Sequence, residues 1–172
     1  MYKNNVTRPG SSNRSAVTSE NGGEIVLYFD GLCEPRNPGG VATFGVVVYM
    51  GKKKIFSEGG LALARPFSDE ASNNVAEYSA LIRGMSWLID NGLNRGRVTI
   101  RGDSRLVVNQ LRGEFKVKAR RIVELYHRAS ELLSQFQDVK VEWVDRSKNS
   151  EADLQSRIAY ARFLREENRK RS

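Results

Sequence analysis

Four acidic residues occupy positions where their carboxylates can act together. Asp30 ends the apolar run IVLYFD and Asp103 closely follows the run RVTIR, so both are expected at the ends of strands. Glu77 falls in the first turns of a predicted helix, and Asp153 begins the last predicted helix. Carboxylates packed side by side repel one another unless a multivalent cation neutralises them. The pattern therefore predicts a metal site.

The available residue types restrict which metal such a site would hold. The chain contains one cysteine and one histidine, so a zinc site built from clusters of these residues is excluded. Oxygen ligands alone favour Mg²⁺ or Mn²⁺. Two such ions about 4 Å apart would activate a water and stabilise the leaving oxygen of a phosphodiester. Taken singly, each acid has a plainer interpretation as a cap or a favourable charge at a helix N-terminus.

Hydrophobic patterning predicts a mixed α/β sheet that positions these acids. Strands are expected at 24–30, 43–50, 53–63, 97–101 and 139–143, and helices at 72–91, 104–112, 122–136 and from about 150 onward. The first three strands follow one another around a tight turn at Gly51, which indicates an antiparallel meander. Helical crossovers make the first, fourth and fifth strands parallel. Active sites in such sheets form where the winding direction reverses, so Asp30 and Asp103 are expected together.

Composition bounds the class of protein and its partners. A chain of 172 residues suits one domain, and we expect it at 24–172, after a flexible N-terminal extension at 1–23 that is rich in Asn, Ser, Thr and Gly. The net charge of +8 favours a polyanionic partner, although a merely solvated basic surface explains it equally well. With one cysteine and no apolar run of membrane-spanning length, a cytoplasmic protein without a membrane partner is expected.

Four runs in the sequence resemble motifs of the ribonuclease HI family. They are YFDGLCEPRNPGG from position 28, SNNVAEYSALIRGM from position 72, IRGDSRLVVNQL from position 100 and R-x-x-N-x-x-A-D from Arg146 to Asp153. The resemblance covers about 24–163 and places the family's metal ligands on Asp30, Glu77, Asp103 and Asp153. It implies a ribonuclease H-like five-stranded mixed sheet of order 3-2-1-4-5 flanked by helices. It also implies two-metal hydrolysis of the RNA strand of RNA/DNA hybrids, leaving 5′-phosphate and 3′-hydroxyl ends.

The same resemblance suggests which residues contact the substrate. A nuclease for hybrids must recognise the 2′-hydroxyl of the RNA strand, a task that suits polar groups near the metals. The matching positions are Gly31, Asn37, Asn73, Asn74, Ser104 and Asn149. Turn and helix-cap chemistry explains such residues equally well. The densest basic cluster, expected to hold phosphates of the DNA strand, comprises Lys116, Lys118, Arg120 and Arg121.

Two departures from the family pattern define the expected subtype. The chain is too short after position 112 for the basic protrusion of bacterial members, so it resembles the compact archaeal-like form. In many members of the family the loop before the last acid carries a histidine that assists proton transfer or product release. This chain lacks that histidine before Asp153. Arg146 stands in the loop instead and is expected to supply only the electrostatic part of that role, since arginine cannot shuttle protons. His127 falls inside a helix and is not expected to replace it.

The motifs leave other activities open. Cleavage of double-stranded RNA is compatible with the compact form, and no obligatory protein partner is implied. A non-catalytic hybrid-binding module would keep the fold and the basic surface, but the intact set of four acids argues against it. Another nuclease or transposase with a related carboxylate cluster is the second alternative, and the NPGG and NNVAE runs favour ribonuclease H over it.

Overall fold

The computed structural model describes residues 23–172. Nearly all of the extension predicted to be flexible lies outside the described residues. The strands are β1 (Ile25–Glu34), β2 (Val41–Met50), β3 (Lys53–Leu61), β4 (Arg97–Gly102) and β5 (Asp138–Trp143). The helices are α1 (Asn73–Asp90), α2 (Arg105–Leu111), α3 (Arg120–Leu133) and α4 (Ser150–Arg171), with a 3₁₀ helix, η1 (Arg146–Lys148), before α4. The predicted succession of elements is confirmed.

The five strands form one mixed sheet of order β3-β2-β1-β4-β5, as expected. β1, β2 and β3 pair antiparallel, and Gly51 takes a positive φ of 58° in the tight turn between β2 and β3. β4 pairs parallel with both β1 and β5. The winding direction therefore reverses between β1 and β4, where α/β sheets commonly carry their active sites.

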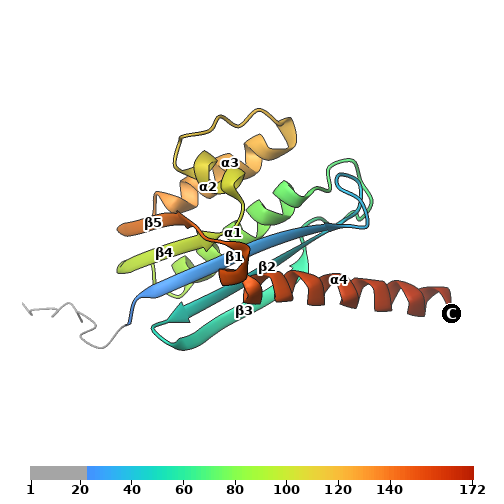
Figure 1. Cartoon of the computed structure of the whole chain (residues 1–172), viewed down its shortest axis with the longest axis horizontal. Helices are drawn as coiled ribbons and strands as arrows, with labels where there is room; N and C mark the ends of the chain where they lie inside the picture. Colours follow the sequence, from blue (N-terminus) through green and yellow to red (C-terminus); the bar gives the residue numbers. More distant parts are fainter. Residues whose placement is uncertain (1–22) are drawn as a thin grey trace, which may run out of the picture.

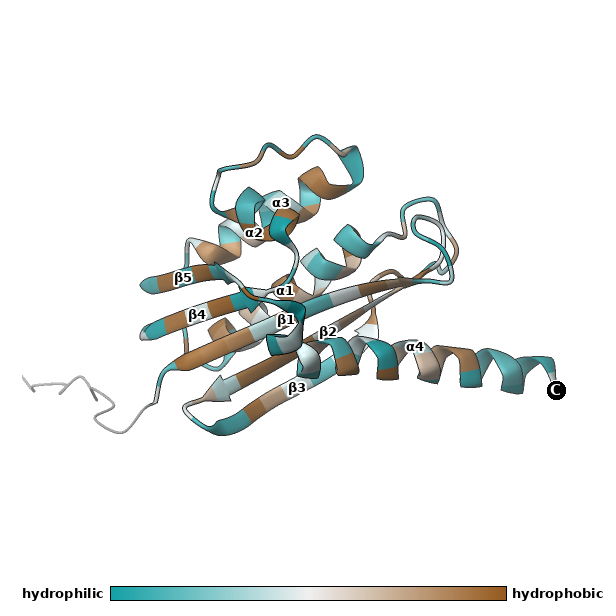
Figure 2. Ribbon diagram, in the orientation of Figure 1, coloured by the Kyte–Doolittle hydropathy of each residue, from teal (hydrophilic) through white to brown (hydrophobic). Residues whose placement is uncertain are grey.

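Helices cover the two faces of the sheet unequally (Figure 1). α1 packs on β1 and β2 and carries α3 beside it, while α4 lies across β1, β2 and β3 on the opposite face. The apolar stripe of α1 is fully buried at Tyr78, Leu81 and Met85. The hydropathy colouring shows apolar strands between these layers and hydrophilic last turns of α4 (Figure 2). Within residues 23–172, no helix combines the length and the apolar character of a membrane crossing.

The first strand is longer than predicted, which corrects the place of Asp30. β1 continues to Glu34 because its pairing with β2 extends as far as Glu34 opposite Val41. Its pairing with β4 stops earlier, at Phe29 opposite Gly102. Asp30 is therefore inside a strand, one residue beyond the last parallel pair, and not at the end of the strand. Asp103 directly follows β4, so both acids still lie where the β1–β4 pairing ends.

Candidate metal centre

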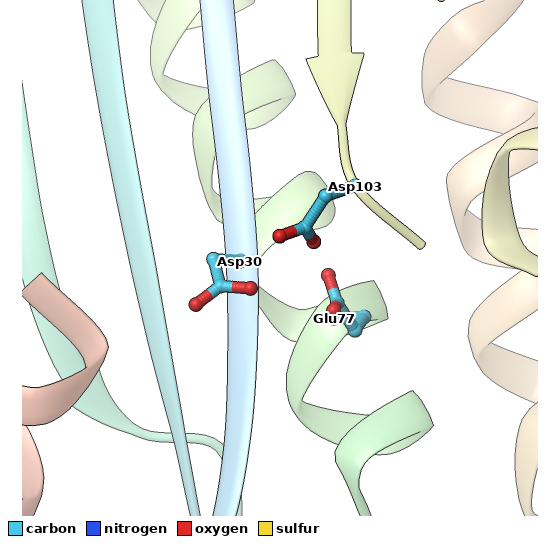
Figure 3. A group of neighbouring side chains, drawn as sticks. All are labelled: Asp30, Glu77 and Asp103. Carbon is cyan, nitrogen blue, oxygen red and sulfur yellow. The ribbon is translucent and has the colours of Figure 1, made fainter. Parts of the chain in front are cut away.

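Three carboxylates from three different elements converge beside the end of β4 (Figure 3). Asp30 of β1, Glu77 of α1 and Asp103 each offer an oxygen, and these oxygens all lie within 4.8 Å of one another. Asp30 and Glu77 are buried and Asp103 is half-buried. Three of the four acids singled out from the sequence are thus brought together, and Asp153 is not in this group.

Close packing of α1 on β1 places Glu77 next to Asp30. Ser72 caps α1 by accepting a hydrogen bond from the Val75 backbone N–H at 3.2 Å, which fixes where the helix begins. The backbone of α1 then passes so near Gly31 that a Cβ atom there would lie 2.2 Å from the Glu77 nitrogen. Only glycine allows this approach, and the approach brings Glu77 to the sheet.

Burial and like charge act together on the acids. Desolvation, with Asp103 and Asp153 adding their repulsion, raises the pKa of Asp30 to about 7. Desolvation also raises the pKa of Glu77 well above its usual range, and the charges of Asp30 and Asp103 add to it. Burial raises the pKa of Asp103 as well, although the nearby Arg146 opposes that shift. Ionising all three groups is therefore costly without a cation.

The donor set fits a hard cation. Every donor is a carboxylate oxygen, and within residues 23–172 no salt bridge reaches Asp30, Glu77 or Asp103. Glu77 Oε2 is buried without a hydrogen-bond partner. A buried carboxylate oxygen left unpaired carries a large desolvation cost that a divalent cation at this position would offset.

Asp153 lies at the rim of the same cleft, between two arginines. Its Oδ2 accepts from Arg157 Nε at 2.9 Å, and its Oδ1 lies 3.5 Å from Arg146 Nη2. Ser156 Oγ lies 3.2 Å from Asp30 Oδ2 and 2.8 Å from the Asp153 carbonyl oxygen, so it links the two acids. Sequence reasoning missed Arg157 and Ser156, although their spacing of four and three residues after Asp153 on a helix was a usable signal.

A cleft of about 430 Å³ surrounds the acids and includes some of the expected substrate-binding residues. Gly31, Asn37 and Asn73 line it, and Asn37 Oδ1 accepts a hydrogen bond from the Asn73 backbone N–H at 3.0 Å. Asn74 and Ser104 do not line it. Ser104 caps α2 instead, by accepting from the Val107 N–H at 3.3 Å.

Asn149 lies beneath the cleft and not on its surface, contrary to its expected role as a substrate contact. Its side chain is buried, with the whole residue 1% exposed, and Nδ2 donates to the Phe29 carbonyl at 2.9 Å. A side-chain hydrogen bond from Asn149 opposes, without reversing, the rise in the pKa of Asp103 that burial causes. Asn149 therefore fastens the start of α4 to β1, which aligns the elements that carry the acids.

The predicted basic cluster spans the connection between α2 and α3 and the first turn of α3, outside the lining of the cleft. Its four side chains, Lys116, Lys118, Arg120 and Arg121, belong to exposed residues. Arg121 Nη1 donates to the Asp69 carbonyl at 2.6 Å, which ties the start of α3 to the loop before α1. His127 is exposed on α3 beside Tyr126 and does not line the cleft.

Comparison with known sequences places these observations among related proteins. The family described as reverse transcriptase-like matches residues 29–159. A ribonuclease HI of Halobacterium salinarum is 37% identical over 139 residues, which are 81% of this chain and 65% of that protein. The bifunctional protein Rv2228c of Mycobacterium tuberculosis is 37% identical over 131 residues, 76% of this chain. The chain spans about a third of the length of this mycobacterial relative, 34%.

Solved structures agree in fold. The N-terminal RNase H domain of Rv2228c, determined as a fusion with maltose binding protein, has a TM-score of 0.73 at 31% identity, covering 83% of this chain and 97% of that one. RNase H1 of Halobacterium salinarum has a TM-score of 0.70 at 31% identity, with 81% and 98% covered. LC11-RNase H1 in complex with RNA/DNA hybrid has a TM-score of 0.71 at 28% identity, with 81% and 99% covered.

Proposed function

Since the chain belongs to the ribonuclease HI family, we propose that it hydrolyses the RNA strand of RNA/DNA hybrids in a metal-dependent reaction. The convergence of Asp30, Glu77 and Asp103 from separate elements carries this proposal. Burial, with repulsion from neighbouring acids, raises the pKa values of all three, a free-energy cost that a bound divalent cation offsets. Such a group favours cation binding over a role as a simple acid or base.

In this proposal Asp30, Glu77 and Asp103 hold Mg²⁺ or Mn²⁺, and Asp153 completes the set from the rim. Two ions would supply an activated water and stabilise the leaving oxygen, which yields 5′-phosphate and 3′-hydroxyl ends. The contact of the α1 backbone with β1 at Gly31 fixes the separation of Asp30 and Glu77, so these ligands need little rearrangement.

Residues around the acids bind and orient the hybrid. Arginine side chains do not shuttle protons, so Arg146 would stabilise the phosphate and move no proton. Asn37 and Asn73, with the backbone at Gly31, line the cleft and are suited to the 2′-hydroxyl groups of the RNA strand. Phosphates of the DNA strand would lie on the exposed cluster of Lys116, Lys118, Arg120 and Arg121.

The decisive experiment follows a labelled RNA strand in an RNA/DNA duplex with Mg²⁺ or Mn²⁺. We expect wild-type protein to cut the RNA, and Asp103→Asn to abolish cleavage while leaving hybrid binding largely intact, because it removes a metal ligand and no phosphate contact. Asp138→Asn is the matched control, since Asp138 is exposed on β5 and pairs with Arg97 away from the cleft. Absence of cleavage by the wild type with either metal would overturn the proposal.

A panel of substrates separates this function from its alternatives. Hybrid, double-stranded RNA and DNA junctions are compared at equal concentrations, and the product ends are analysed. We expect the hybrid to be cut fastest, with slower cleavage of double-stranded RNA by this compact form. A strong preference for DNA-only substrates would indicate a transposase-like or resolvase-like nuclease, and binding of the hybrid without cleavage would indicate a non-catalytic module.

A further inference from the structure

A second cavity lies alongside the catalytic cleft, on the sheet face that α4 partly covers. Its volume is about 470 Å³, and it shares no lining residue with the cleft. Its floor is formed by Val26 and Tyr28 of β1, Tyr49 of β2 and Arg101 of β4. The turn at Gly51 and Lys52 closes one end, and its wall is formed by Lys148, Asn149, Ser150 and Glu151. This volume falls within the range of sites that bind small ligands.

The cavity adjoins the elements that carry the acids of the cleft. Tyr28 precedes Asp30 by two residues on β1, and Arg101 precedes Asp103 by two residues around the end of β4. Residues two apart on a strand share a face and lie roughly 7 Å from each other. Lys148 likewise follows Arg146 by two residues on η1. A polymer lying in the cleft can therefore reach the cavity within one or two of its units.

Aromatic rings and cations supply the chemistry of this cavity. Tyr28 and Tyr49 meet edge to face, with ring centroids 6.2 Å apart. The Arg101 guanidinium lies 5.9 Å from the Tyr28 ring centroid and donates from Nη1 to the Tyr28 hydroxyl at 3.2 Å. The rings are therefore held in place before any ligand binds. Fixed aromatic side chains among cations are the features on which proteins stack the bases of single strands.

The charges of the cavity leave two lysines for an anion. Its one acid, Glu151, is engaged by the Tyr49 hydroxyl and by Lys54, whose Nζ lies 3.2 Å from Oε2. Arg101 is paired with Glu142 at 2.9 Å. Lys52 and Lys148 are exposed and form no salt bridge within residues 23–172. The two free cations flank the aromatic floor, where they suit the phosphates of a bound strand.

We propose that this cavity binds an unpaired nucleotide of a strand that continues out of the catalytic cleft, with its base against Tyr28 and Tyr49 and its phosphates at Lys52 and Lys148. The inference rests on the proposed function, since it assumes a nucleic-acid substrate in the cleft. A cavity of this size has room for a single nucleotide. The protein therefore binds hybrids that end in a single-stranded extension more tightly than blunt hybrids.

The test measures fluorescence anisotropy of the full chain with a short blunt hybrid and with the same hybrid carrying a five-nucleotide unpaired extension. The extension is placed in turn on each end of each strand. We expect one placement to lower the dissociation constant about tenfold, in line with the stacking of a base on an aromatic side chain. The double variant Lys52→Ala/Lys148→Ala should lose this gain while binding the blunt hybrid almost as wild type does.

Two controls separate a built pocket from general attraction to a basic protein. Arg95→Ala/Arg128→Ala removes the same charge from exposed positions outside the cavity and should keep the gain. Tyr49→Phe keeps the ring and should keep the gain, whereas Tyr49→Leu should lose it. No gain from any extension, or an equal loss in both double variants, overturns the inference. Cleavage of the blunt hybrid is measured in parallel, so that failure of the pocket is distinguishable from failure of the nuclease function.

Discussion

Replacing Gly31 by alanine would place a methyl group within the backbone of α1. The added Cβ would lie 2.2 Å from the Glu77 nitrogen, 2.6 Å from the Ala76 carbonyl carbon and 2.8 Å from the Ala76 Cβ. Two of these three atoms belong to backbone, so no change of rotamer relieves the contact. The helix must move away from β1, and Glu77 moves with it.

The size of this movement sets the expected effect. Restoring the shortest contact to ordinary van der Waals distance requires a shift of roughly 1 Å, and overpacking of this kind costs about 1–3 kcal/mol of folding free energy. A misplacement of about 1 Å at a reacting centre lowers rates by about 100-fold. Gly31→Ala should therefore unfold at lower denaturant, bind Mn²⁺ more weakly and cut the hybrid about 100 times more slowly.

Urea unfolding, calorimetric Mn²⁺ titration and single-turnover cleavage measure the three effects. Gly96→Ala is the matched control, because a Cβ at Gly96 meets no atom within 4 Å and its φ is not positive. This control should be as stable as the wild type or slightly more stable, since alanine restricts the unfolded chain. If Gly31→Ala kept wild-type stability and cut the hybrid within twofold of the wild-type rate, the close approach would not be what positions Glu77.

Three further results are expected. Arg157→Ala removes the cation paired with Asp153, so the affinity for Mn²⁺ measured by calorimetry should rise about fivefold. The control Arg157→Lys keeps the charge and should bind Mn²⁺ about as wild type does. A weaker affinity in the alanine variant would contradict this prediction. Without metal, Asp30 alone should lower the free energy of unfolding by up to about 1.4 kcal/mol per pH unit between pH 4 and 7, because folded Asp30, with its pKa raised to about 7, keeps a proton that the unfolded chain releases. Urea titrations check the slope, which should flatten in Asp30→Asn. Ser156→Ala removes a hydrogen bond that lowers the pKa of Asp30. In a plot of cleavage rate against pH, the rise on the acid side should therefore move to higher pH. An unchanged acid side of this plot would contradict the prediction.

Local signals explain why the first helix was predictable within one residue at each end. Ser72 caps it, Gly92 follows it with a positive φ of 69°, and its apolar stripe fits a period of 3.6 residues. The length of β1 was not predictable in the same way. The residues after Asp30 include a glycine and an acid, which are poor strand formers, and it is pairing with β2 that keeps them extended.

Some features of the candidate site were likewise predictable from local sequence, and others depend on contacts between distant residues. The acid types and their positions on elements were visible in the sequence, because each falls near the end of a run with clear periodicity. The rim position of Asp153 was not, since it depends on the arginines that its two oxygens meet. The burial of Asn149 was hidden for the same reason: its partner is the Phe29 carbonyl, 120 positions away in the chain.

The carboxylates come from the first strand, the first helix, the end of the fourth strand and the last helix. Only the first helix and the fourth strand follow one another in the chain, so the centre exists only after β4 has paired with β1 and both helices have docked. Such long-range contacts close late and slowly during folding. After dilution from urea, nuclease activity should therefore recover more slowly than helical circular dichroism, and its lag would time the last docking step.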